Sequence, residues 1–118
     1  MSQDPRFQKV IDRINNFREA REWKQFHSPK NLAMSLAMEA SEVMEFFQWC
    51  STEEAREVVK KKNDALSEEL ADVGIYLLQL CEESGVDLLS AIERKMDINE
   101  SKYPVEKAKG NATKYNEL

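Results

Sequence analysis

Residues 30–50 read KNLAMSLAMEASEVMEFFQWC, and this stretch decides the fold. It contains neither glycine nor proline, and it follows Ser28-Pro29, a cap residue with proline in the first helical turn. Its apolar residues recur at spacings of three and four, which is the repeat of an amphipathic helix. The stretch therefore predicts one helix from Lys30 to Cys50, roughly 30 Å long.

Other helices flank this stretch on both sides, each marked by a start or stop signal in the sequence. Asp4 followed by Pro5 begins the first, whose apolar stripe fades between residues 21 and 26. The remaining bounds are Ser51-Thr52 to about Lys62, Asn63 or Asp64 to Ser84 before Gly85, and Asp87 to about Lys102. Nothing alternates with the period of two that strands require. The sequence thus predicts an all-α fold, a four-helix-bundle-like single domain over residues 1–118 with an irregular tail at 103–118.

The composition limits the classes of protein to which the chain can belong. Its 118 residues suffice for one domain, and 33% charged residues with only 3 glycines favour solvated helices. A net charge of −5 argues against a nucleic acid polymer as partner, because such binding needs clustered Lys and Arg. The polar N-terminus and the lack of a long apolar run predict neither a signal peptide nor a membrane span. Cys50 and Cys81 are too few for a disulfide scaffold, so we expect a cytoplasmic protein.

Carboxylates interrupt the apolar stripes of the two long helices. Glu39 on one helix and Glu69 on the other stand where the repeat assigns a core residue. Each has an acid three residues further on, Glu42 and Asp72, which projects from nearly the same side. Such pairs also arise by chance in a chain with 22 acidic residues, where most are solvated. Two pairs that interrupt two stripes at matching heights are much less expected by chance.

Four converging carboxylates need a cation, because a buried unpaired carboxylate is costly and neighbouring carboxylates repel one another. No basic residue lies on either stripe near them, and Mg²⁺ takes oxygen ligands while keeping positions open for water and phosphate oxygens. A di-iron site needs a Glu-x-x-His pair on two helices, and the only histidine, His27, lies outside both. The sequence therefore predicts Mg²⁺ held by Glu39, Glu42, Glu69 and Asp72.

The same residues resemble the signature of the MazG-like all-α nucleoside triphosphate pyrophosphohydrolases, an ExxE pair followed after a spacer by ExxD. The pairs here are Glu39-Ala-Ser-Glu42 and Glu69-Leu-Ala-Asp72. Three segments are similar to the dCTP pyrophosphatase-like branch nearly without gaps: WKQFHSPKNLAMSLAMEASEVMEFFQW, EELADVGIYLL and SGVDLLSAIERKMDINESKYP. The likeness covers most of the chain from Phe17 onward and is looser in REVVKKKNDALS. The resemblance therefore defines the preferred substrate less closely than the type of reaction.

The resemblance implies Mg²⁺-dependent hydrolysis of (deoxy)nucleoside triphosphates, dCTP among them, between the α- and β-phosphates to a monophosphate and pyrophosphate. It also implies a dimer or a homotetramer with sites at subunit interfaces. A carboxylate not fully used by the metal, Glu42 or Glu39, would take the proton of the attacking water. Two alternatives stay open. One is a relative acting on dUTP or a phosphoribosyl-ATP-type compound, and the other is a metal-stabilised helical interaction module without activity.

Four residues on the later helices are candidates for substrate binding. Lys95 and Asn99 interrupt the apolar row of the last helix, where phosphate contacts and ordinary surface roles are equally compatible with the pattern. The likeness of KMDINESKYP to the family favours substrate and adds Tyr103. Tyr76 lies one turn beyond Asp72, where its hydroxyl could reach a phosphate or a ligating carboxylate, or simply a core partner.

His27 and Trp49 match positions that the family uses around the base. They are 22 residues apart and mostly on one helix, so in one chain they would lie roughly 30 Å apart. A single base cannot touch both residues across that distance. If both contact the base, one of them must come from a second subunit, which predicts an interfacial site.

Overall fold

The computed structural model describes residues 4–118, and every regular element among these residues is helical. The all-α prediction is therefore confirmed. The long elements are α1 (Pro5–Ala20), α2 (Pro29–Glu45), α3 (Thr52–Lys61), α4 (Asn63–Ser84) and α5 (Leu88–Lys102). The short ones are η1 (Lys24–Phe26), α6 (Val105–Ala108) and η2 (Tyr115–Glu117), so the tail from 103 to 118 is partly helical.

Side-chain caps fix the helix ends that the sequence marks most strongly. The Asp4 carboxylate accepts hydrogen bonds from the backbone N–H groups at the start of α1, at 3.0 and 3.1 Å. Ser51 and Glu54 form a reciprocal capping box at the start of α3. Gly85 ends α4 with φ of +66°, a left-handed conformation in which a side chain would be strained. These three expected boundaries are confirmed.

Two expected boundaries were wrong. Helix α2 ends at Glu45 and not at Cys50, because its last backbone bonds tighten to the i→i−3 type, as in Phe47 N–H donating to Met44 C=O at 3.0 Å. The chain must turn there to reach the Ser51 cap. Neither Asn63 nor Asp64 caps α4, whose cap position is Lys62 without a side-chain bond. Lys62 also ends α3, so a single residue joins the two helices and no room remains for a separate cap.

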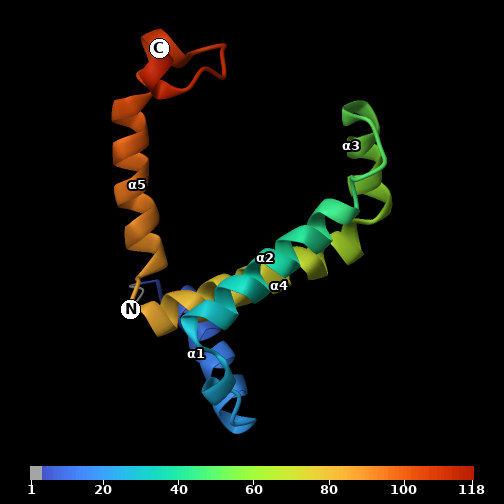
Figure 1. The fold of residues 1–118 in the computed structure, drawn as a ribbon, viewed down its shortest axis with the longest axis vertical. Helices are drawn as coiled ribbons and strands as arrows, with labels where there is room; N and C mark the ends of the chain where they lie inside the picture. Colours follow the sequence, from blue (N-terminus) through green and yellow to red (C-terminus); the bar gives the residue numbers. More distant parts are fainter. Residues whose placement is uncertain (1–3) are drawn as a thin grey trace.

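Helices α2 and α4 form the centre of the fold (Figure 1). They lie side by side along most of their length and run in opposite directions. Helix α3 forms the connection between them. Helix α1 crosses one end of this pair and packs against the C-terminal half of α4. Helix α5 leads away from the same end, while α3 stands at the opposite end (Figure 1). None of the described helices is long and apolar enough to cross a lipid bilayer.

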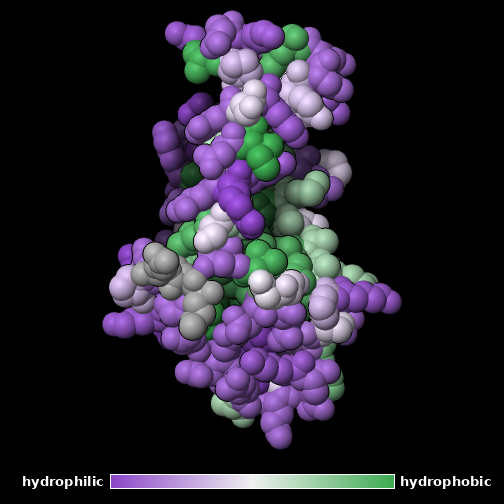
Figure 2. Space-filling model, turned by 90° about the vertical axis from the view of Figure 1, so that its left-hand side faces the viewer, coloured by the Kyte–Doolittle hydropathy of each residue, from purple (hydrophilic) through white to green (hydrophobic). Residues whose placement is uncertain are grey.

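The described chain buries little apolar surface by itself. Among residues 4–118 only Leu32 and Leu66 are buried apolar side chains, at 1% and 8% exposed. Apolar side chains gather in the middle of the face drawn in Figure 2. The radius of gyration is 17.7 Å, against about 13.5 Å for a compact domain of this length. One chain therefore pairs two long helices but does not close the four-helix bundle that the sequence suggested.

Candidate metal and phosphate site

The predicted carboxylates meet at the interface of α2 and α4. Glu39 comes from α2, while Glu69 and Asp72 come from adjacent turns of α4. One oxygen from each of these three side chains lies within 4.8 Å of the other two. Glu42, one turn after Glu39, is close enough to affect the titration of both Glu39 and Glu69. The pairing of two antiparallel helices thus brings all four acids into one cluster.

Two oxygens in this cluster are buried without a partner. Oε2 of Glu39 and Oε2 of Glu69 have no hydrogen-bond partner among residues 4–118. A buried acceptor without a donor costs free energy, so side chains rarely keep this arrangement unless a ligand completes it. The donor set consists of carboxylate oxygens alone, which suits a hard divalent cation such as Mg²⁺. The residues present therefore fit the metal that the sequence predicts.

The electrostatics of the cluster favour protonation while no cation is bound. A hydrogen bond to Glu42, available only when Glu69 carries a proton, is the main cause that raises the pKa of Glu69 to about 7. Burial and the charges of Glu42, Asp72 and Glu39 act in the same direction. For Glu39 burial is the main cause of a raised pKa, followed by Glu42 and Asp72. A divalent cation must displace the proton held by Glu69, so the affinity of the cluster for the cation should rise with pH.

The raised pKa of Glu69 predicts how stability depends on pH in the presence of a chelator. Between its ordinary value of 4.5 and about 7, the folded protein holds a proton that the unfolded chain has released. The contribution of Glu69 to the free energy of unfolding is therefore fully present below pH 4.5 and is lost as the pH rises through 7. Chemical unfolding in EDTA at a series of pH values should show stability falling across this range.

The matched control for this experiment is Glu69→Gln, which keeps the side-chain shape but cannot titrate. Its stability should change less over the same pH range than that of the unmodified protein, because the group whose pKa is raised to about 7 no longer titrates. Equal pH dependence in the two proteins would show that Glu69 titrates normally.

An open hollow lies beside the carboxylates. Its volume is about 460 Å³, and it is lined by Glu42, Glu45, Phe46, Lys62 and Glu69. A second hollow of about 630 Å³ shares Phe46 and Lys62 with the first and adds Lys60 and Lys61. Negative and positive side chains thus adjoin in one continuous region, which is the arrangement needed for a metal next to phosphate groups.

Lys62 was missed as a site residue at the level of the sequence. It lies four residues before Leu66 and seven before Glu69, so it continues the same stripe of α4. Following that stripe backwards by two turns would have found it. The expectation that no basic residue adjoins the carboxylates is therefore wrong at this end of the cluster, where Lys62 lines the hollow with Glu42 and Glu69.

The structure does not bring the candidates on α5 to the carboxylates of the same chain. Lys95 and Asn99 lie on α5, which leaves the α2–α4 pair from its far end, and Tyr103 caps that helix (Figure 1). Tyr76 lies on α4 one turn beyond Asp72 and is half-buried. Its place on α4 is compatible with the site, whereas the α5 residues lie away from the site within one chain.

His27 and Trp49 lie beyond opposite ends of α2. The helix alone, from Pro29 to Glu45, spans about 24 Å. Trp49 is 89% exposed, while His27 is half-buried against α1. A nucleobase cannot contact both residues in one chain, which is the separation expected from the sequence.

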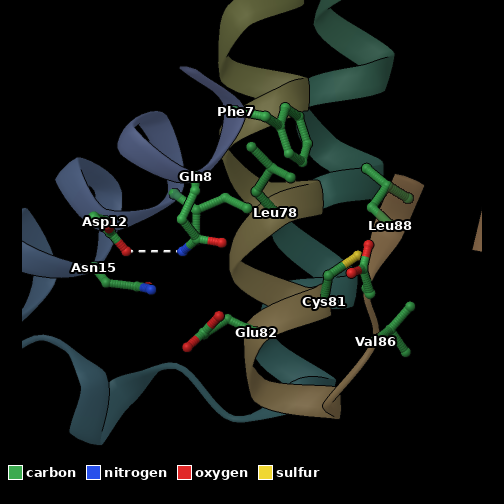
Figure 3. Close-up of a pocket in the computed structure, with 11 residues that line it drawn as sticks. Phe7, Gln8, Asp12, Asn15, Leu78, Cys81, Glu82, Val86 and Leu88 are labelled. Atoms are coloured by element: carbon green, nitrogen blue, oxygen red, sulfur yellow. Dashed lines mark hydrogen bonds between the residues drawn. The ribbon is translucent and has the colours of Figure 1, made fainter. Parts of the chain in front are cut away.

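A different, smaller cavity lies between α1, α4 and the start of α5 (Figure 3). It has a volume of about 170 Å³, and Gln8 donates a hydrogen bond to Asp12 at its wall, at 2.9 Å. Phe7, Leu78 and Leu88 also line it. None of the candidate site residues contributes to this cavity, and we assign it to the packing of α1 on α4.

Comparison with known proteins gives consistent results. The sequence profile of the MazG-like family matches residues 34–118. The dCTP pyrophosphatase 1 proteins of Mus musculus and Homo sapiens are 40% and 39% identical to this chain, and each alignment covers 99% of this chain and 70% of the relative. A crystal structure of a pyrophosphatase from Archaeoglobus fulgidus superposes with a TM-score of 0.83 at 40% identity, covering 88% of this chain and 97% of that one.

Proposed function

This chain belongs to the MazG-like family, and we propose that it is a nucleoside triphosphate pyrophosphatase with dCTP among its substrates. The reaction cleaves the bond between the α- and β-phosphates and gives a nucleoside monophosphate and pyrophosphate. The observation that carries the proposal is the cluster of Glu39, Glu69 and Asp72, whose oxygens converge next to a hollow that Lys62 also lines. Relatives named dCTP pyrophosphatase at 39–40% identity support the same substrate.

We assign Mg²⁺ to the carboxylate cluster, with Glu39, Glu42, Glu69 and Asp72 as its holders. The two unpartnered oxygens of Glu39 and Glu69 are the strongest support for this assignment. When bound, Mg²⁺ supplies the positive charge that neutralises phosphate oxygens and makes a water molecule more acidic. The protein's part is to hold that charge at the α2–α4 interface and to orient the triphosphate towards it.

Proton transfer falls to a carboxylate of the same cluster. Glu42 is exposed and lines the hollow, while Glu39 is partly buried with one oxygen directed into the cluster. Glu42 is therefore the better placed of the two to accept the proton of the attacking water, and Glu39 the better placed to bind the cation. Glu42 is our candidate general base.

The product pattern tests the reaction. Incubation of the protein with dCTP and Mg²⁺ should release dCMP and pyrophosphate in equal amounts, with no dCDP. A panel with dUTP, dTTP, dATP, dGTP and CTP then ranks the bases and sugars. Release of orthophosphate together with dCDP would contradict cleavage between the α- and β-phosphates, and Mg²⁺ binding without turnover of any nucleotide would identify a non-catalytic module.

Lys62 should contribute to binding of the phosphates. Replacing it with Met should raise KM for dCTP by about tenfold to 100-fold, the effect of one charge-assisted hydrogen bond, with a smaller change in kcat. Steady-state kinetics at saturating Mg²⁺ measure both constants. Lys9→Met on α1 is the control, because Lys9 is exposed and lies outside both hollows. Equal KM values for the two variants would show that Lys62 does not contribute to binding of the phosphates.

We further propose that the active form is a dimer or a tetramer with interfacial sites, in the cytoplasm. The low burial of apolar side chains and the radius of gyration of 17.7 Å support association, since a chain so extended leaves its apolar faces open. In such an assembly α5 of a second subunit would present Lys95, Asn99 and Tyr103 to the phosphates, with Tyr76 on α4 of the first. The free cysteines Cys50 and Cys81 suit a reducing compartment.

A further inference from the structure

A buried arginine ties three parts of the chain together near His27. The Arg18 side chain, on the last turns of α1, is fully buried. One guanidinium nitrogen donates to Glu83 of α4 at 2.6 Å, and another donates to Asn15 at 3.3 Å. The third, Nε, donates to Nδ1 of His27 at 3.0 Å. A buried guanidinium is stable only when its donors are used in this way.

The contact with Nε of Arg18 determines where the His27 ring carries its proton. A guanidinium has N–H donors and no acceptor, and it does not lose its proton in proteins. Nδ1 of His27 must therefore supply a lone pair, so the ring is neutral and its proton resides on Nε2. Burial and the neighbouring Arg18 charge both lower the pKa of His27, while Glu83 opposes them.

Hydrogen bonds on both sides of His27 hold its backbone in place, and the bond from Arg18 then orients the ring. The His27 N–H donates to Lys24 C=O at 3.1 Å in the turn η1, and Ser28 then caps α2 with a bond to the Asn31 N–H at 3.1 Å. Asn31 also donates from its side chain to Phe26 C=O at 3.1 Å. Nε2, on the opposite side of the ring from Arg18, has no partner among residues 4–118 and remains available to a ligand.

We propose that Arg18 is a positioning residue that fixes the Nε2–H tautomer of His27 and thereby makes His27 a hydrogen-bond donor towards the nucleobase. The proposal rests on the proposed function, in which His27 contacts the base. It implies that the base presents an acceptor to His27, which in a cytosine is the 2-carbonyl oxygen or N3 and not the exocyclic amino group. The other neutral tautomer would present an acceptor at Nε2 and would favour the exocyclic amino group of cytosine.

His27 is the only histidine of the chain, so its ring can be observed without ambiguity. We expect imidazole ¹⁵N spectra of the substrate-free protein at neutral pH to show a proton on Nε2 and a bare Nδ1, with a pKa below 6.5. A proton on Nδ1, or a charged ring, in the unmodified protein would overturn the proposal. This measurement needs neither a variant nor activity, so it stays informative if dCTP is not hydrolysed.

Two matched variants separate the influences of Arg18 and Glu83. Arg18→Met should raise the pKa of His27 and populate both tautomers, because it removes the donor and the nearby positive charge. Glu83→Gln should lower the pKa further and leave the tautomer unchanged, because Arg18 remains and the opposing charge is lost. Arg6→Met, an exposed substitution on the same helix, should change neither property. An unchanged tautomer in folded Arg18→Met would contradict the assigned role.

Kinetics distinguish positioning from simple support of the fold. Arg18→Met should raise KM for dCTP by about threefold to tenfold, the effect of one lost hydrogen bond, with kcat changed less. In a His27→Phe background the same substitution should add no further increase, because its effect acts through the ring. If KM of the double variant rose by the product of the two single increases, Arg18 would act independently of His27, and this would overturn the proposal.

Discussion

Replacing Glu42 with Gln should lower kcat for dCTP hydrolysis by about 100-fold to 10,000-fold, the range for loss of a general base. Glu42 is exposed, so the change should leave the fold and the unfolding temperature nearly unaffected. Because Glu42 also helps to hold Mg²⁺, the variant should bind the cation more weakly, but the loss of kcat should persist at saturating Mg²⁺, since the lost function is acceptance of a proton. Steady-state kinetics over a Mg²⁺ titration measure it.

Glu39→Gln provides the comparison within the same cluster. Since Glu39 directs a buried oxygen into the cluster, its loss should weaken Mg²⁺ binding, and activity should recover in part at high Mg²⁺. Glu53→Gln, an exposed change on α3, serves as the control with unchanged kinetics. If Glu42→Gln recovered with Mg²⁺ and Glu39→Gln did not, the roles of the two carboxylates would be exchanged.

Mixing two inactive variants should restore activity. At dCTP concentrations far below KM, His27→Ala and Trp49→Ala should each retain little activity if the base pocket needs both residues. Unfolded together and refolded as an equal mixture, they should regain about a quarter of normal activity. Half of the dimers are then hybrids, and a twofold interface gives each hybrid one intact site of its two.

The control for this experiment refolds each variant alone, which should give no recovery. A hybrid with no activity above that of the separate variants would count against a pocket shared between subunits. Wild-type protein refolded in parallel corrects for losses during refolding.

The sequence predicted most of the helical architecture because the signals are local. Cap residues such as Asp4 and Ser51 and the left-handed Gly85 act on backbone groups within one turn, so the chain near them determines the outcome. The end of α2 was predicted less well. The apolar residues from Phe46 onward continue the helical pattern, but the tightening of the last turn depends on where α3 must begin.

The site shows the same division between local and distant causes. Glu39 and Glu69 were recognisable because each interrupts its own helical stripe. Arg18 also continues the stripe of α1, four residues after Ile14, and an arginine at such a position signals a buried partner. That partner, Glu83, lies 65 residues away, and no local pattern connects the two. The placement of α5, which leads away from the end of the α2–α4 pair, likewise follows from the tertiary arrangement and from no local pattern.

The hairpin of α2 and α4 has a consequence for the order of folding. Its two helices are joined by one short helix, so their pairing closes a small loop and can occur early, before α1 and α5 find their places. Glu39, Glu69 and Asp72 approach one another in this same step. Their mutual repulsion should therefore be present in the transition state for folding, and a divalent cation should increase the folding rate as well as slow unfolding.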